Sequence, residues 1–294
     1  MKRDHTLTWT APAALDFTGV GVAVIGGTGG IGRALAKALA GRGASVTVVG
    51  RKFRDHDVPG LRFVAADLAS MTEARHIGET LPIDDLDLVV FTTGIMAGPV
   101  REVTPDGLER DLAVSWLSRL AILRALAPRL TTGRLPERPK PRVFVMGFPG
   151  SGQRANVVDL NSERSYGRMT AHMTTVAGNE ALVVDAARRY PDLLTFGLNP
   201  GFVKTGIRTN LFGGRNWLYR LVEGLAGLAT RTAEDYARTT LPLLSAPELE
   251  GRSGAMFDSR GRAILPSKWT ATSELDAVIT ASEELLRRAS PAGA

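Results

Sequence analysis

The stretch VAVIGGTGGIG, residues 22–32, decides the fold of this 294-residue chain. Its first four residues form an apolar run that predicts a buried strand, and the Ala- and Leu-rich segment from Arg33 to Leu39 predicts a helix directly after the glycine turn. A strand, a glycine turn and a helix in that order are the arrangement that a dinucleotide-binding loop requires. Glycine lets the backbone approach a pyrophosphate closely, and the helix N-terminus offers free N–H groups to the phosphate charge.

Two glycine spacings fit this loop. Gly27, Gly29 and Gly32 follow the pattern G-x-G-x-x-G, while Gly26, Gly30 and Gly32 follow G-x-x-x-G-x-G. A glycine turn can also be a simple tight connector, so the interpretation depends on the sequence that follows it.

Segments that predict strands alternate with segments that predict helices along the rest of the chain. The predicted strands are 22–25, 46–49, 61–65, 86–91, 143–146 and 194–198, and the main predicted helices are 33–39, 71–80, 170–189 and 273–288. This alternation predicts one α/β domain with a Rossmann-like, doubly wound parallel sheet and helices on both of its faces. Residues 1–20 are expected to form an irregular lead-in, 135–141 a surface loop, and the residues from Asp258 to the last helix polar turns.

The composition is that of an ordinary globular protein, with 44% hydrophobic and 22% charged residues. No cysteine is present, so disulfides and thiolate metal sites are excluded, no metal site is expected, and a reducing cytoplasm is the expected location. No apolar stretch predicts a secretion signal or a membrane span. The net charge of +6 comes from scattered basic residues without interleaved stacking aromatics, which argues against a nucleic-acid partner.

The second predicted strand ends with Arg51 and Lys52, roughly 20 positions after the glycine loop, where a doubly wound fold faces the adenosine ribose. An acid at this position binds the 2′-hydroxyl of NAD, whereas a guanidinium pairs with a 2′-phosphate. Arg51 therefore favours NADP(H) over NAD(H), although a solvated loop arginine would look the same in sequence. Asp67, after the third predicted strand, could accept a hydrogen bond from the adenine amino group or cap the helix that follows.

Several further motifs accompany the glycine loop. They are DLAS at 67–70, LDLV at 86–89 before TTG at 92–94, DLNSER at 159–164, NPGFVKT at 199–205, and PELEG at 247–251 with Ser253 and Gly254. Taken together, they resemble the short-chain dehydrogenase/reductase family, and within it the retinol-dehydrogenase-like members, over about residues 21–286. The resemblance implies a Rossmann-like sheet, NAD(P)(H) binding and oxidoreduction between carbonyls and alcohols.

The resemblance and the glycine loop together imply a set of cofactor-binding residues, with the segment from Pro200 to Thr205 closing on the nicotinamide and the diphosphate. The expected set is Gly26, Thr28, Gly29, Gly30, Ile31, Gly32, Arg51, Lys52, Asp67, Leu68, Thr93, Gly94, Pro200, Gly201, Val203 and Thr205.

The proton-transfer residues of the family are missing. The family uses a Ser, a Tyr, a Lys three residues beyond that Tyr, and a supporting Asn. The resemblance aligns the Tyr and Lys positions with His172 and Val176, and Tyr166 with an earlier, non-catalytic tyrosine. If Tyr166 were the acid instead, Thr170 would stand at the lysine position. The serine position falls on Gly147 or Phe148, with Ser151 too far along, and the asparagine position falls on Ser115.

Three sources could supply the missing proton. Imidazole titrates near neutrality, so His172 is a candidate acid, directly or through water, although it could equally fill the space of the tyrosine. Tyr166 could swing in, but a role as loop anchor is more plausible. A ketone beside an acidic phenol or enol, as in aromatic polyketides, would carry its own proton donor. Ser115 is the other expected catalytic residue.

The substrate side of the site is expected to be apolar. Phe148 in place of a serine suits a large, flat, hydrophobic substrate, and Met96 and Phe202 are the other expected substrate contacts. Residues 206–230 are expected to form a small helical lid with an apolar face, which could also simply pack on the domain.

We therefore expect an atypical NADPH-dependent ketoreductase that acts on a bulky hydrophobic, aromatic polyketide-like molecule, as in antibiotic biosynthesis. Two alternatives remain: a nucleotide-binding relative that performs cyclisation or isomerisation, and an inactive protein that senses NADP(H). The family commonly forms dimers or tetramers, so a homo-oligomer is an open expectation.

Overall fold

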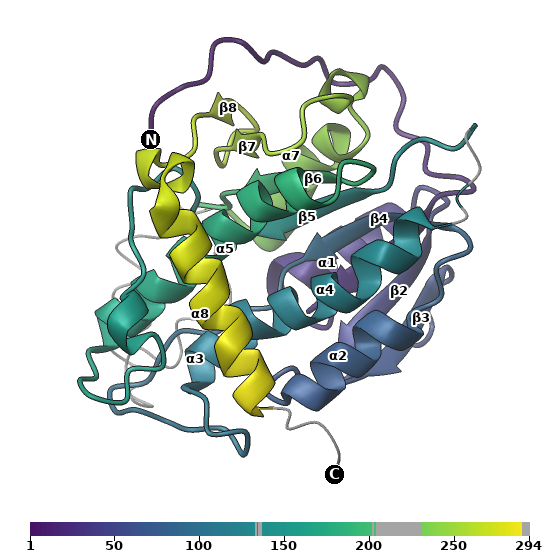
Figure 1. Ribbon diagram of the computed structural model, residues 1–294. Coiled ribbons are helices and arrows are strands. Elements are labelled where there is room, and N and C mark those ends of the chain that lie inside the picture. The colour runs from purple at the N-terminus through teal and green to yellow at the C-terminus, as the bar shows by residue number, and fades with distance from the viewer. Residues whose placement is uncertain (133, 135–136, 202, 204–230, 290–294) are drawn as a thin grey trace.

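A single sheet runs through the middle of the molecule (Figure 1). The computed structural model describes residues 1–294 apart from 133, 135–136, 202, 204–230 and 290–294. Within that part of the chain the sheet has eight strands in the order β3-β2-β1-β4-β5-β6-β7-β8, and every neighbouring pair is parallel except β7 with β8. The strands are β1 (Gly21–Ile25), β2 (Ser45–Gly50), β3 (Leu61–Ala65), β4 (Leu86–Phe91), β5 (Arg142–Met146), β6 (Leu194–Leu198), β7 (Met256–Phe257) and β8 (Ala263–Ile264).

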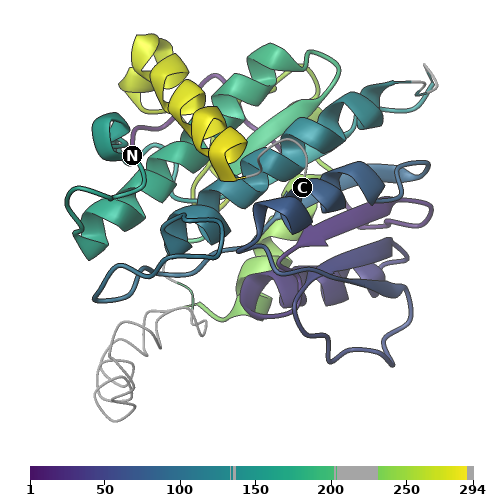
Figure 2. The same cartoon turned by 60° about the horizontal axis from the view of Figure 1, so that its bottom comes forward.

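Helices cover both faces of the sheet (Figures 1 and 2). Helices α1 and α7 pack on one face, whereas α2, α4 and α5 pack on the other, where α8 lies outside α5. A short turn, α3, and a π-helical turn lead directly into α4. The helices are α1 (Gly30–Ala40), α2 (Met71–Thr80), α3 (Arg110–Leu112), the π turn (Ala113–Leu117), α4 (Ser118–Thr131), α5 (Arg168–Arg189), α7 (Ala233–Leu244) and α8 (Ser273–Ala289).

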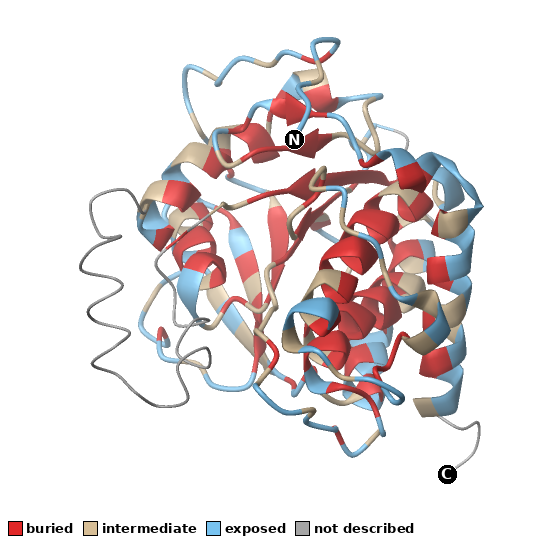
Figure 3. Ribbon diagram, turned by 90° about the vertical axis from the view of Figure 1, so that its left-hand side faces the viewer, coloured by how far each residue is buried: buried red, intermediate tan, exposed pale blue. Residues whose placement is uncertain are grey.

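The hydrophobic pattern of the elements explains these layers. All five residues of β1 are buried, as expected for a parallel strand that is covered on both faces (Figure 3). Helix α1 buries a stripe at Ile31, Leu35 and Leu39 and leaves its other side to solvent. The sheet therefore separates two apolar layers, one between it and each set of helices.

The strand order reverses its direction at β1, which pairs with β2 on one side and with β4 on the other. From β1 the chain continues to β2 and β3 in one direction, and β4 begins the run in the opposite direction. Open α/β sheets bind ligands in the crevice at the carboxyl ends of their strands at such a reversal. The fold thus places the expected site beyond Ile25 and Phe91.

The predicted α/β fold is confirmed, and the predicted element bounds agree closely with the structure. The segments 61–65, 71–80, 86–91 and 194–198 form elements with those bounds, and the other predicted elements are longer by one to three residues at an end. Helix α1 begins at Gly30, three residues before Arg33, because the glycine-rich first turn carries no apolar periodicity that would reveal it as helical.

The expectation of simple polar turns after Asp258 is wrong. Strand β7 ends directly before Asp258 and strand β8 lies within this region; both extend the sheet, but each has two residues, too few to show a periodicity. The lead-in is irregular but packs against the domain, since Arg3 bridges to Ile264 and Leu7 and Phe17 are buried.

Among the described residues, no helix has both the length and the apolar character needed to cross a membrane.

Candidate active site

A cavity of about 700 Å³ opens where the strand order reverses. It extends from the glycine loop past the end of β4 to the start of α5. The residues predicted from sequence that line it are Gly26, Thr28, Gly29, Gly30, Ile31, Gly32, Arg51, Asp67, Leu68, Thr93, Gly94, Met96, Ser115, Phe148, His172 and Pro200. The fold therefore brings most of the predicted cofactor, catalytic and substrate residues to one space.

Two glycines of the loop are required by close packing. Gly26 has φ +89°, and a Cβ at this position would lie 2.6 Å from the backbone nitrogen of Thr93. A Cβ on Gly32 would lie 2.3 Å from Oγ1 of Thr92. The glycine backbone therefore lies too close to the end of β4 to admit a side chain. The G-x-x-x-G-x-G spacing corresponds to a packing requirement and not to a simple connector.

The N-terminus of α1 faces the cavity with its N–H groups available. Gly29 is the N-cap and provides no side-chain hydrogen bond, the first turn carries no acidic residue, and a Cβ on Gly29 would meet no atom within 4 Å. Near it, Oγ1 of Thr93 is buried without a hydrogen-bond partner among the described residues. Open N–H groups, a positive helix end and an orphaned hydroxyl fit the diphosphate and ribose of a dinucleotide.

Arg51 is exposed at the end of the cavity that lies beyond β2, and Lys52 is exposed but does not line it. Another arginine of this region, Arg33, is committed to Asp55 through Nε at 2.7 Å and Nη2 at 2.5 Å. The Arg33 guanidinium holds the pKa of the Asp55 carboxyl below its usual value, and Lys37 adds to this effect. Of the arginines in this region, Arg51 lines the cavity, whereas Arg33 and Arg54 do not, so Arg51 is placed to meet a ligand phosphate.

Asp67 lines the cavity beside Leu68, and its carboxylate accepts a hydrogen bond from the backbone N–H of Ala69 at 3.1 Å. The alternative that Asp67 caps the following helix is wrong. Ser70 is the N-cap of α2 and accepts from the backbone N–H of Glu73 at 3.3 Å.

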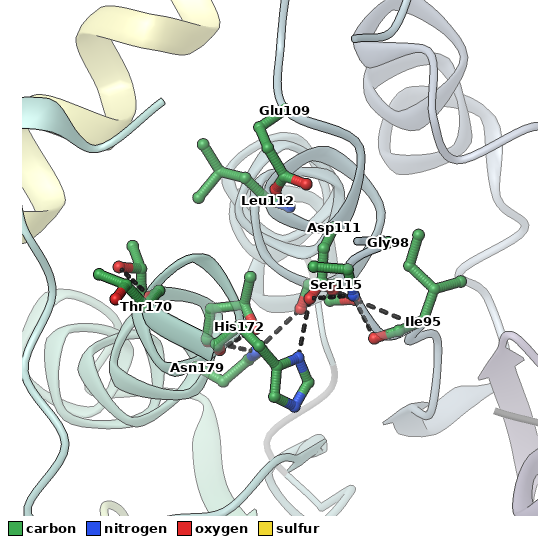
Figure 4. Close-up of polar contacts among 12 residues, drawn as sticks. Ile95, Gly98, Glu109, Asp111, Leu112, Ser115, Thr170, His172 and Asn179 are labelled. Carbon is green, nitrogen blue, oxygen red and sulfur yellow. Dashed lines mark hydrogen bonds and ion pairs between the residues drawn. The ribbon is translucent and has the colours of Figure 1, made fainter. Parts of the chain in front are cut away.

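A histidine–aspartate pair lies at the other end of the cavity (Figure 4). Nδ1 of His172, on α5, is 2.7 Å from Oδ2 of Asp111, on α3. Asp111 is fully buried, and its carboxylate also accepts hydrogen bonds from the Ser115 hydroxyl at 2.5 Å and from the Ala97 backbone N–H at 3.1 Å. An ionised carboxylate only accepts hydrogen bonds, so Nδ1 carries the proton and Nε2, which points away from Asp111, is left for a ligand.

Ser115 acts here as a structural partner of the pair. Its hydroxyl accepts from the Ile95 backbone N–H at 3.0 Å and donates to Asp111, so it joins the segment after β4 to the π turn. π turns of this kind are frequent at functional sites because they reorient single side chains. Asp111 was not predicted from the sequence, although residues four positions apart, such as Asp111 and Ser115, lie on one face wherever the chain is helical.

Tyr166 is an anchor of the loop after β4. Its hydroxyl donates to the carbonyl of Gly98 at 2.7 Å. Burial raises the pKa of this phenol, and the nearby carboxylates of Glu109 and Asp111 raise it further, so its proton is held more tightly than in water. Tyr166 does not line the cavity.

The apolar residues Met96, Phe148 and Val176 line the same cavity as His172. Gly147 also lines the cavity, and a Cβ on it would lie 3.2 Å from Cβ of Asn179, so a serine at this position would crowd α5.

The segment after β6 contributes Pro200 to the cavity. Gly201 adopts φ +65° and donates its N–H to the Asn199 side chain at 2.8 Å, whereas Val203 is buried and bridged to Arg231; neither lines the cavity. Phe202, Thr205 and the expected lid, 206–230, lie outside the described residues.

Comparisons with known proteins agree with this geometry. A family model for short chain dehydrogenases matches residues 21–135. An "Uncharacterized oxidoreductase" of Saccharomyces cerevisiae is 44% identical over 294 residues, which cover 98% of this chain and 95% of the relative. The chain belongs to the short-chain dehydrogenase/reductase family. It is an oxidoreductase by family, with a fold that binds a nicotinamide cofactor.

Other members of the family are more distant. A protein of Streptomyces sp. (strain C5) with the name "Putative daunorubicin C-13 ketoreductase" is 30% identical over 257 residues, covering 81% of this chain and 83% of the relative. A crystal structure of a Mycobacterium paratuberculosis protein has a TM-score of 0.70 at 22% identity and covers 95% of this chain and 98% of its own. A 3-oxoacyl (acyl-carrier-protein) reductase of Agrobacterium tumefaciens with NADP bound has a TM-score of 0.61 at 23% identity, covering 83% and 94%. These two structural likenesses concern the fold.

Proposed function

We propose that the protein is an NADPH-dependent ketoreductase in which His172, held by Asp111, donates the proton to the substrate oxygen. The observation that carries the proposal is the shared cavity, which joins the open end of α1 and Arg51 to Nε2 of His172. When bound, the nicotinamide cofactor supplies a hydride to a carbonyl carbon. The protein must then place that carbonyl and protonate its oxygen.

The cofactor end of the cavity supplies binding groups along its length. The free N–H groups at the start of α1 suit the diphosphate, and the buried Thr93 hydroxyl suits a ribose oxygen. Arg51 suits a 2′-phosphate because guanidinium pairs bidentately with phosphate. These residues support the choice of NADPH.

The proton-donating end is preorganised. Two donors besides His172 fix the Asp111 carboxylate, so the imidazole is held in one orientation with Nε2 toward the cavity. The carboxylate stabilises the imidazolium, which donates its Nε2 proton as the carbonyl oxygen becomes negative. After the transfer the neutral ring keeps its Nδ1 hydrogen bond to Asp111 and regains a proton from solvent, since its side chain is 20% exposed.

The substrate class follows from the apolar wall. Met96, Phe148 and Val176 line the cavity that holds the proton donor, and mostly apolar pockets with a few polar groups bind hydrophobic molecules. The Streptomyces relative named as a daunorubicin ketoreductase would act on such an aromatic polyketide. We therefore propose a bulky aromatic ketone as the substrate.

The proposal is tested by calorimetric titration with NADPH and NADH, followed by NADPH consumption with a polycyclic aromatic ketone. We expect tighter binding of NADPH, and turnover that consumes one NADPH for each alcohol formed. In His172→Gln the kcat is expected to fall about 100-fold or more, the effect of removing a general acid. The matched control His76→Gln, on the exposed side of α2, should retain the wild-type kcat.

Two results would overturn parts of the proposal. Failure to bind either nucleotide would exclude a reductase, and would leave a relative with other chemistry. A full kcat in His172→Gln would transfer the role of acid to the substrate's own phenol or enol.

A further inference from the structure

A buried arginine lies beneath the cavity and has no part in the scheme above. Arg119 follows Ser115 by one helical turn and is 3% exposed. Its guanidinium donates to the carbonyl oxygens of Thr93 and Met146 and, at 2.7 Å, to Oδ1 of Asn179. The charge therefore lies between the carboxyl ends of β4 and β5 and helix α5.

None of these three acceptors is charged, and no carboxylate oxygen among the described residues lies within 4 Å of the guanidinium. Its Nε is also buried without a hydrogen-bond partner in the described part of the chain. Burial lowers the pKa of Arg119 to about 9, and the nearest compensating charge is Asp111. By contrast Arg124, on the same helix, pairs with both Asp185 and Glu283.

A buried cation without a direct counter-ion lowers the stability of the fold, so a functional reason for its position is expected. Arg119 lines the cavity next to Ser115 and His172. A Cβ on Gly94 would lie 3.9 Å from Nη2 of Arg119 and 3.8 Å from the Ser115 hydroxyl. The guanidinium thus lies close to Gly94, in the segment after β4 that lines the cavity.

We propose that Arg119 is a fixed positive charge beneath the cavity that weakens the hold of the nearby Asp111 carboxylate on the His172 proton, so that this proton passes more readily to the substrate oxygen. The Asp111 carboxylate contacts Nδ1 of His172 at 2.7 Å and is also the compensating charge nearest to Arg119, so the two cations compete for it when His172 is protonated. Arg119 is a positioning residue because it acts through Asp111. The effect on catalysis rests on the proposed function, whereas the effect on His172 does not.

Other charged groups around His172 do not replace Arg119. Glu102 and Arg110 at the cavity edge form an ion pair with each other. Burial raises the pKa of Glu109, which caps α3, so its charge is disfavoured. Tyr166 and Arg168 lie at or just before the start of α5, the helix that carries His172.

The decisive experiment is an NMR titration of the histidine side chains in the cofactor-free protein. The chain has four histidines, and the His172 signal is assigned by its loss in His172→Gln. Arg119→Gln and Arg119→Met remove the charge, and Arg119→Lys retains it. We expect the neutral variants to raise the His172 titration midpoint by about one pH unit, and Arg119→Lys to leave it close to wild type.

The matched control is Arg142→Gln at the opposite end of β5. Arg142 also donates to two backbone carbonyls, those of Leu244 and Ala246, and burial also lowers its pKa. Arg142→Gln should leave the His172 midpoint unchanged. A purely structural role for Arg119 would change the melting temperature without changing the midpoint.

The outcomes separate this proposal from the proposed function. An unchanged midpoint in a folded neutral variant overturns the role of Arg119, even if the protein reduces ketones. A raised midpoint in a protein that reduces no ketone keeps the charge coupling and overturns the reductase. If only Arg119→Lys folds, the arginine serves folding and the proposal is overturned.

Discussion

Asp111→Asn tests the central claim that a buried carboxylate holds and charges the proton donor. The substitution preserves the size of the side chain but removes the charge 2.7 Å from Nδ1 of His172. Hydrogen bonds between ionised groups contribute about 1.5–3 kcal/mol, so the protonated imidazole should lose stabilisation of this size. At about 1.4 kcal/mol for each factor of ten, kcat should fall roughly 10- to 150-fold.

The pH dependence of activity in Asp111→Asn should also change, in a direction that the structure predicts. Reduction requires protonated His172, so activity falls as the pH rises through the titration of the imidazole. Without the Asp111 carboxylate the imidazolium is less stable, and this decline should move to lower pH by about one to two units. Arg119→Gln should move it in the opposite direction, because it removes a positive charge.

The assay is kcat against pH from 5 to 9 with a saturating ketone, measured beside nucleotide binding by calorimetry. The control is Asp185→Asn, which removes another carboxylate of low exposure, far from the cavity and paired with Arg124. The reasoning is refuted if Asp111→Asn folds, binds NADPH as wild type does and shows an unchanged pH profile.

Three further predictions concern the rest of the site. Gly32→Ala should abolish measurable NADPH binding and lower the free energy of unfolding by about 1–3 kcal/mol, because the alanine Cβ would overlap the Thr92 hydroxyl. Denaturant titration would measure this loss of stability, and wild-type stability would contradict the prediction. Arg51→Glu should weaken NADPH binding roughly 10- to 100-fold and leave NADH binding near wild type in calorimetry, whereas an equal loss for both nucleotides would exclude a phosphate contact. Tyr166→Phe should cost about 1 kcal/mol of stability through the lost bond to Gly98 and change kcat less than about threefold, and a loss of activity like that of His172→Gln would make Tyr166 the acid.

The sequence predicts the fold well because its signals are local. Each apolar run of five or six residues, such as Leu86–Phe91, is long enough to identify a buried strand, and glycines mark the turn after β1. Strands β7 and β8 escape prediction because two residues carry no period. The pairing of β7 with β6 also depends on residues more than fifty positions away, and β8 joins the sheet only by pairing with β7.

The contacts among the charged residues at the proton-donating end of the cavity could not be predicted from the sequence, because they depend on tertiary packing. His172 lies 61 residues from Asp111, and their contact exists only because α3 and α5 pack together. Arg119 is one of three arginines on α4, and an arginine on a helix predicts a solvent-facing position. Its burial depends on three acceptors from β4, β5 and α5 that the fold alone brings to one point.

The two halves of the cavity differ in how they tolerate change. The cofactor end depends on backbone contacts, since Gly26 and Gly32 touch the segment after β4 too closely to admit a side chain. The proton-donating end needs only one acidic group at the right depth in the cavity, and an electrostatic field that favours release of the proton from that group. A histidine on the turn of α5 that faces the cavity meets the first need, and the Asp111 carboxylate orients it. Arg119, on α4, supplies this electrostatic field from a buried position. Val176 and Phe148 therefore remain available to form an apolar wall of the cavity.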